Sequence, residues 1–260
     1  MLKTLFQTVP ITRAERTTWS MNEELVPAHK VNMAAEVDAT AMHRIREEAK
    51  VRGETAPSYT AFVIRAAART MSKNPTANRA ILGPPLLTRL VQFNCTDISV
   101  AVEKSLPALP GQAFASPIRN PLERSLSDVT LELRELSKAT AQDHPGFRLY
   151  MRILKFVPRP FSTWMIGFPR WSPSAWIRYR GCAAWVNSPA RDGADLVFAT
   201  WPWPISFSFG LVRERAVVVN GEVRARLTMP ILLAFDRRIM GGGPGSRLLA
   251  DFKSFLENPE

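Results

Sequence analysis

The sequence predicts a mixed α/β domain in which helices flank a sheet in layers, the arrangement also described as α+β. Some short segments alternate between apolar and polar residues, as strands with one buried face do. Longer segments repeat apolar residues at helical spacing. The order of these signals along the chain is strand, helix, helix, strand, helix, then strands and a final helix, which indicates packed layers of sheet and helix.

The first elements are a strand and two helices. Apolar residues alternate over residues 31–37, which predicts a half-buried strand. Asp38 is expected to cap the helix that follows, whose apolar face consists of Met42, Ile45 and Ala49. Pro57 and Ser58 open a second helix. Its nearly continuous apolar residues predict burial, and they are Phe62, Val63, Ala66, Ala67 and Met71.

The middle of the chain continues this alternation. Residues 98–102 read as another strand, and Asn120-Pro121 is expected to start a helix. The apolar stripe of that helix consists of Leu122, Leu126, Val129, Leu133 and Leu136. Nearer the C-terminus, residues 216–219 and 222–227 flank Asn220-Gly221, which predicts a β-hairpin.

The last 32 residues predict a strand, an exposed loop and a helix. An apolar run over 231–235 meets the polar residues Asp236, Arg237 and Arg238, and a glycine turn over 241–243 follows. The final helix has one apolar side, made of Leu248, Leu249, Phe252, Phe255 and Leu256. Loops held between two rigid elements often carry functional sites, so we place the candidate site here.

Composition limits the classes of partner. The net charge of +11 favours nucleic acid, an anionic membrane surface or a phosphate-bearing ligand such as coenzyme A. No helix-turn-helix, zinc-finger or nucleoprotein motif is visible, so nucleic acid is not favoured. Residues 149–168 contain three basic residues and two prolines and do not predict a membrane span. Cys95 and Cys182 give no metal or redox spacing, so we expect a cytoplasmic, reduced protein without a metal.

Residues 229–260 resemble the end of the catalytic domain of dihydrolipoyl acyltransferases, the core subunits of 2-oxoacid dehydrogenase complexes. That family shares its fold with chloramphenicol acetyltransferase. Its pattern, Asp-His-Arg-x-x-Asp-Gly-Ala before a helix that ends near Leu-Glu-x-Pro, matches this chain in frame from Asp236 to Gly243 and again at residues 256–259. Within this frame, Arg237 replaces the family's histidine and Gly241 replaces its aspartate.

The resemblance extends to residues 31–40, 58–75, 98–102 and 117–136. It implies a chloramphenicol acetyltransferase-like fold, a mixed sheet with flanking helices, and a homotrimer whose site lies at the subunit interface. We expect one catalytic domain over 1–260. A lipoyl domain, with its modified lysine, and a subunit-binding domain would not fit before residue 10, so a freestanding homologue is expected.

A basic and aromatic insertion is expected over 144–180, where no acidic residue occurs. One interpretation is a segment, residues 147–176, that lies on an anionic membrane surface and makes the protein membrane-peripheral, or that forms a lid over an acyl site. The other is an arm packed on the domain or on a neighbouring subunit. We favour the arm, because four prolines break the segment into short pieces.

For the chemistry, the resemblance implies acyl transfer between thiols, usually those of coenzyme A and dihydrolipoamide. In the family the motif histidine takes a proton from the attacking thiol, and a Ser or Thr across the interface donates to the oxyanion. Arg237 cannot accept a proton, since its guanidinium has no acceptor and stays charged. It can bind a carboxylate, phosphate or oxyanion, lower the pKa of a nearby thiol, or pair with Asp236 or with another subunit.

Three further residues complete the candidate site. The turn after Trp185 is the nearest match to the family's oxyanion segment, and either Asn187 or Ser188 could donate there; the alternative is an ordinary turn. Among the three histidines, His29 is the best replacement base, because family members often place a histidine near this position beside the channel. A structural role for His29 is the alternative. His43 is expected to be solvated.

These observations favour an acyl-thioester-handling protein. It would be a coenzyme A-dependent acyltransferase, or a condensation or cyclisation catalyst, that does not need the motif histidine. The alternative is a catalytically inactive trimeric scaffold or binding partner that keeps the fold and the acyl pocket.

Overall fold

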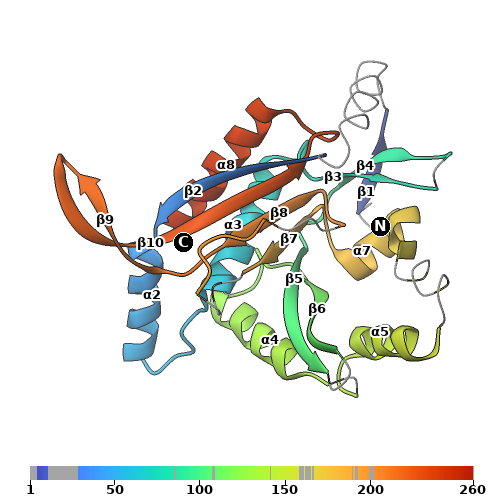
Figure 1. Ribbon diagram of the computed structural model, residues 1–260, viewed down its shortest axis with the longest axis horizontal. Helices are drawn as coiled ribbons and strands as arrows, with labels where there is room; N and C mark the ends of the chain where they lie inside the picture. Colours follow the sequence, from blue (N-terminus) through green and yellow to red (C-terminus); the bar gives the residue numbers. More distant parts are fainter. Residues whose placement is uncertain are drawn as a thin grey trace.

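A seven-stranded mixed sheet runs through the computed structural model (Figure 1). The structure describes residues 5–10, 29–84, 86–106, 109–140, 142–157, 161, 165, 167–188, 190, 193–198 and 202–259. The strand order is β2 (Lys30–Asp38), β10 (Glu222–Asp236), β8 (Ile205–Phe209), β7 (Ala184–Asn187), β5 (Ile98–Leu106) and β6 (Leu109–Ile118), and β9 (Arg213–Val219) also pairs with β10. The β5–β7 and β7–β8 pairs are parallel, and the other pairs are antiparallel.

Four helices accompany this sheet: α2 (Thr40–Val51), α3 (Tyr59–Lys73), α4 (Leu126–Lys138) and α8 (Gly242–Glu257). Helices α3 and α8 pack against each other and against the sheet, where the Phe207 and Phe252 rings lie 4.4 Å apart. The core between them is close to fully apolar, as the run of apolar residues in α3 predicts. The predicted layered α/β architecture is therefore confirmed.

A second, smaller antiparallel sheet contains β1 (Phe6–Val9), β4 (Arg89–Phe93) and β3 (Arg79–Leu82), in that order. The basic and aromatic region contains α5 (Pro145–Phe156), the 3₁₀ helix η1 (Phe168–Trp171) and α7 (Pro173–Arg180). Figure 1 shows α5 beside the β5–β6 pair and α7 near the smaller sheet.

Several predicted elements occur where the pattern placed them. The burial of β2 alternates as expected, and Ser58 caps α3 by accepting a hydrogen bond from the Ala61 amide at 3.2 Å. The Asn220-Gly221 hairpin is present, with φ of 53° and 84° at the two turn residues. Positive φ at both positions is what a type I′ turn requires. The strand after this hairpin continues through the predicted 231–235 strand as one 15-residue element.

Three predicted boundaries were wrong. Helix α4 begins at Leu126 and not at Asn120-Pro121, because Ser125 and Asp128 form a capping box there. Asn120 instead adopts φ 45° while its amide donates to Asp97 Oδ1. The N-cap of α2 is Ala39, although Asp38 still accepts from the Thr40 amide at 2.8 Å. The glycine turn is shorter than expected, since α8 already starts at Gly242.

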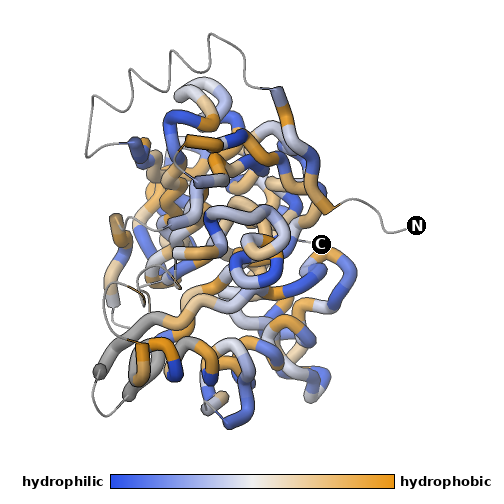
Figure 2. The backbone as a smooth tube through the Cα atoms, turned by 90° about the vertical axis from the view of Figure 1, so that its right-hand side faces the viewer, coloured by the Kyte–Doolittle hydropathy of each residue, from blue (hydrophilic) through white to orange (hydrophobic). Residues whose placement is uncertain are grey.

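Among the described residues, no helix is both long enough and apolar enough to cross a bilayer. Figure 2 shows hydrophobic and hydrophilic stretches alternating along the backbone tube. In the 147–176 segment the two end residues, Phe147 and Trp176, are buried, whereas Phe156 and Phe161 are 70% and 63% exposed. Both ends therefore pack on the domain, as the packed-arm interpretation expects. Trp164 lies outside the described residues, and binding to an anionic membrane surface stays a prediction.

Candidate functional site

The candidate site begins where β10 ends, beside the start of β2. The two strands pair in register up to Asp236 and Lys30. One residue further, the Arg237 amide donates to the His29 carbonyl at 2.7 Å. Two of the predicted site residues, 208 positions apart in the sequence, therefore lie side by side at the end of one strand pair.

The motif loop is held by an ion pair that does not involve Arg237. Arg238 donates to Asp236 through its backbone amide, Nε and Nη2, the last at 2.7 Å from Oδ2. Asp236 is buried, and this bidentate contact satisfies its carboxylate. The Arg237 side chain is exposed, and no residue in the described ranges forms an ion pair with it. Its guanidinium is therefore available to an anion.

His29 differs from the other two histidines. It is half-buried, and its Nδ1 atom is inaccessible to solvent and lacks a hydrogen-bond partner among the described residues. His144 caps α5 by accepting from the Phe147 amide. His43 is half-buried and lies 3.3 Å from the Tyr59 hydroxyl through Nδ1, so the expectation of a solvated His43 was wrong. A buried polar atom without a partner is uncommon and is worth a functional explanation.

Lys30 is a neighbour of this loop that the sequence did not single out. Its Nζ donates to the carbonyls of Trp203 and Pro204 at 2.5 and 3.1 Å. Burial lowers the pKa of Lys30 to about 8, with Asp236 opposing the shift and Arg238 adding to it. From the sequence, a lysine in a half-buried strand is expected to face solvent. The burial of Lys30 becomes visible only in the fold, where residues 203–204 pack over its side chain.

The predicted oxyanion residues lie at the end of β7. Asn187 is buried, and its Oδ1 accepts a hydrogen bond from the Ser208 hydroxyl. This leaves the Asn187 amide N–H groups without a partner in the described part of the chain. The Ser188 hydroxyl, by contrast, donates to the Phe209 carbonyl at 2.9 Å. Of the two, Asn187 is the better placed donor for a ligand.

Asn187 borders a cavity of about 460 Å³ at the carboxyl ends of β7 and β8, beside the first half of β5. Its floor is apolar and its rim is polar. The lining residues are Arg46, Ser58, Tyr59, Thr60, Val100, Ala101, Val186, Asn187, Ser188, Ala190 and Phe209. Sequence reasoning missed the rim residues of α2 and α3, because only the fold brings Arg46 of α2 and the first residues of α3 beside β7.

One chain does not bring the two halves of the predicted site together. Asn187 pairs with Ser208, and Ser208 pairs with Leu232 on β10. Arg237 lies five residues further along β10, which corresponds to roughly 17 Å at the rise of a β-strand. The His29–Arg237 pair and the Asn187 cavity are therefore at opposite ends of the sheet.

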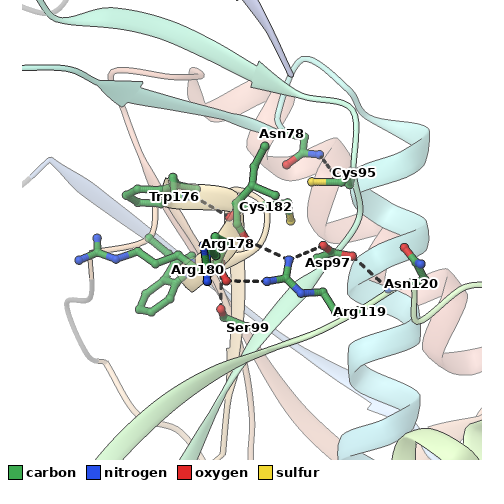
Figure 3. A network of polar contacts seen from close by, with 12 residues as sticks. Asn78, Cys95, Asp97, Ser99, Arg119, Asn120, Trp176, Arg178, Arg180 and Cys182 are labelled. Atoms are coloured by element: carbon green, nitrogen blue, oxygen red, sulfur yellow. Dashed lines mark hydrogen bonds and ion pairs between the residues drawn. The ribbon is translucent and has the colours of Figure 1, made fainter. Parts of the chain in front are cut away.

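Neither cysteine is suited to nucleophilic chemistry. Both thiols are free, burial raises the pKa of Cys95 to about 11, and it also raises that of Cys182. They belong to the polar cluster around Asp97 and Arg119 in Figure 3. Within the described residues, no group of three or more His, Cys, Asp or Glu side chains could hold a metal ion.

The chain has a chloramphenicol acetyltransferase-like fold. A chloramphenicol acetyltransferase structure superimposes with a TM-score of 0.53 and 15% identity, covering 97% of this chain and 98% of that one. More specifically, a family model described as 2-oxoacid dehydrogenases acyltransferase (catalytic domain) matches residues 4–144 and 207–260. The chain belongs to this family.

Two relatives illustrate how far the similarity reaches. The dihydrolipoyllysine-residue acetyltransferase component of a pyruvate dehydrogenase complex from Mycoplasma capricolum is 23% identical over 225 residues, 85% of this chain and 44% of that protein. This chain thus spans less than half of that relative. A dihydrolipoamide acetyltransferase structure from Azotobacter vinelandii, in which the catalytic roles of a serine, a histidine and an asparagine were investigated, has a TM-score of 0.64 and 16% identity, covering 97% of this chain and 91% of that one.

Proposed function

We propose that this protein handles acyl thioesters, as a coenzyme A-dependent acyltransferase or as a condensation or cyclisation catalyst without the motif histidine. The observation that carries the proposal is the pairing of β2 with β10, which holds His29 beside Arg237. A histidine directly before the neighbouring strand is thereby close to the motif position, which itself offers no base.

His29 is proposed to take the proton that the motif histidine takes in the family. A neutral imidazole has one nitrogen that accepts a proton, so His29 can take the proton of an attacking thiol and later return it to the leaving thiolate. The unpartnered Nδ1 supports this assignment, because a purely structural histidine would be expected to satisfy both ring nitrogens. In the transfer, the thiolate attacks the acyl carbonyl and a tetrahedral oxyanion forms. When the tetrahedral intermediate collapses, it expels the thiolate of the donor thioester. That thiolate takes up the proton that His29 returns.

Arg237 is proposed to act as a cation beside this base. Its exposed guanidinium favours the thiolate over the thiol and thus lowers the barrier to proton removal. Asn187 is proposed to donate an amide N–H to the oxyanion from a second subunit. Within one chain, the His29–Arg237 pair and Asn187 are at opposite ends of the sheet. A homo-oligomer is therefore needed to complete the site, and the family resemblance implies a trimer.

The proposal is tested by thiol release from a panel of acyl-CoA substrates, with His29→Asn as the diagnostic variant. Loss of the base should lower kcat/KM by about a hundred- to ten-thousand-fold. His144→Asn is the matched control, because asparagine also caps helices and His144 lies in the α5 cap. Equal activity of the His29→Asn variant and the parent would remove His29 from the mechanism.

A catalytically inactive scaffold is the second candidate function. It is favoured by the same loop, in which an arginine and a run of glycines occupy positions that carry chemistry in the family. The double variant Arg237→His, Gly241→Asp discriminates the two functions. Activity gained from a silent parent supports the scaffold, whereas activity lost from an active parent supports a rebuilt site. A parent that neither binds nor turns over any acyl-CoA would contradict acyl-thioester handling.

A further inference from the structure

The cavity beside Asn187 contains a cation with an unusual set of neighbours. Arg46, which projects from α2, donates through Nη1 to the Pro57 carbonyl. Its guanidinium carbon lies 4.2 Å from the centre of the Tyr59 ring, and the Tyr59 hydroxyl contacts His43 Nδ1. Backbone and ring thus hold the guanidinium in one position on the cavity rim.

The carboxylates near Arg46 are engaged elsewhere. Glu47 pairs with Lys50 at 2.7 Å, Glu48 with Arg44 at 3.8 Å and Glu54 with Arg52 at 2.9 Å. In the described ranges, no acidic side chain is within ion-pair distance of Arg46. A half-buried guanidinium that is fixed in place but lacks a counter-ion still has N–H donors to offer to an anion.

A second feature adds positive potential at the same rim. The first residues of α3, Tyr59 and Thr60, line the cavity next to the N-cap Ser58. The amino end of a 15-residue helix carries the positive end of its dipole and favours an anion. The floor below, made of Val100, Val186 and Phe209, suits a hydrocarbon chain.

We propose that this cavity binds an acyl group whose far end carries a carboxylate. The thioester carbonyl would lie at Asn187, the methylene chain over the apolar floor, and the terminal carboxylate on Arg46 and the start of α3. The inference rests on the proposed function for the thioester, whereas the carboxylate contact rests on Arg46 and the start of α3.

The test compares glutaryl-CoA with valeryl-CoA, which have the same carbon number and differ in the terminal carboxylate. Titration calorimetry without an acceptor thiol should show glutaryl-CoA binding about tenfold tighter or more, the scale of a charge-assisted hydrogen bond. Arg46→Gln should bring the ratio close to one while leaving valeryl-CoA binding within about twofold of the parent. Arg46→Lys, which keeps the charge but not the planar fork, should retain part of the preference.

Arg44→Gln is the matched control, because it removes the same charge from an exposed position on the same helix. It should leave the ratio unchanged. Three results would overturn the inference. The parent could show no preference for glutaryl-CoA over valeryl-CoA, or Arg44→Gln could lower the ratio as much as Arg46→Gln does. Arg46→Gln could also weaken both ligands equally, as the loss of a contact to the coenzyme A phosphates would.

If neither acyl-CoA binds, the thioester function fails, and free glutarate against free valerate then tests the carboxylate site by NMR shift perturbation. Glutarate binding that Arg46→Gln abolishes would support the carboxylate site without the thioester function. Absence of glutarate binding would overturn both.

Discussion

Gly245 determines how closely α8 approaches the end of β10. A Cβ atom at this position would lie 2.4 Å from the Phe235 ring, which is fully buried in the core. The absence of a side chain at residue 245 therefore brings the final helix against the strand that carries Asp236 and Arg237.

We predict that Gly245→Ala lowers the free energy of unfolding by about 1–3 kcal/mol, the usual cost of overpacking a core. Gly243→Ala is the control on the same helix, where the nearest atom would be Arg247 Nη1 at 3.8 Å. That variant should be neutral or more stable by up to about 1 kcal/mol, because alanine favours helix. Urea denaturation measures both, and equal effects of the two substitutions would contradict the packing argument.

Lys30 gives a prediction for pH. Its pKa is lowered to about 8 in the folded chain, so between about pH 8 and the ordinary lysine range the unfolded chain binds the additional proton. The contribution of Lys30 to stability is therefore complete at high pH and is lost as the pH falls through about 8. The free energy of unfolding of the parent, measured relative to Lys30→Met, should rise between pH 8 and pH 10. A flat difference would mean that Lys30 keeps its ordinary pKa.

Individual residues also show where sequence reasoning ends. Arg237 and Asn187 were found by resemblance to the family pattern. The strand that leads to Arg237 was predicted, whereas β7, which ends at Asn187, was not. His29 was selected by resemblance, but its contact with Arg237 depends on the register between β2 and β10, which no local pattern encodes. Arg46 had no signal at all, since a lone arginine on a charged helix reads as solvated until Pro57 and Tyr59 are folded against it.

At the scale of elements, periodicity predicted the existence and type of the long segments well and their ends less well. The start of α4 was misplaced because Asn120-Pro121 imitates a helix start, whereas the Ser125–Asp128 capping box determines it. The run of 222–236 reads as two strands, but it folds as one, first pairing with β9 and then with β2 and β8. Long-range pairing, and not local propensity, joins the two parts.

For the whole molecule, the separation of the two half-sites predicts complementation between subunits. His29→Asn and Asn187→Ala should each be nearly inactive as homo-oligomers. Mixed oligomers formed by refolding the two variants together should regain activity, because some interfaces then combine an intact His29 with an intact Asn187. Light scattering and mass spectrometry establish that mixed oligomers form. Mixed oligomers without any recovered activity would show that the two halves do not act together.

The polar cluster in Figure 3 affects which substitutions residues 145–206 can accept during evolution. Arg119 binds Asp97 and donates to the carbonyls of Ile177 and Arg178, and the Cys182 and Ala183 amides donate to Asp97 and Asn78. The side chains of Arg119 and Asn78 and the main-chain carbonyl of Asp97 lie in the part that the family model matches. They bind main-chain atoms within residues 145–206, which the family model does not match. Every residue except proline offers the same main-chain donor and acceptor. Substitutions within residues 145–206 can therefore change the side chains of this segment without removing the hydrogen bonds that hold it to the sheet.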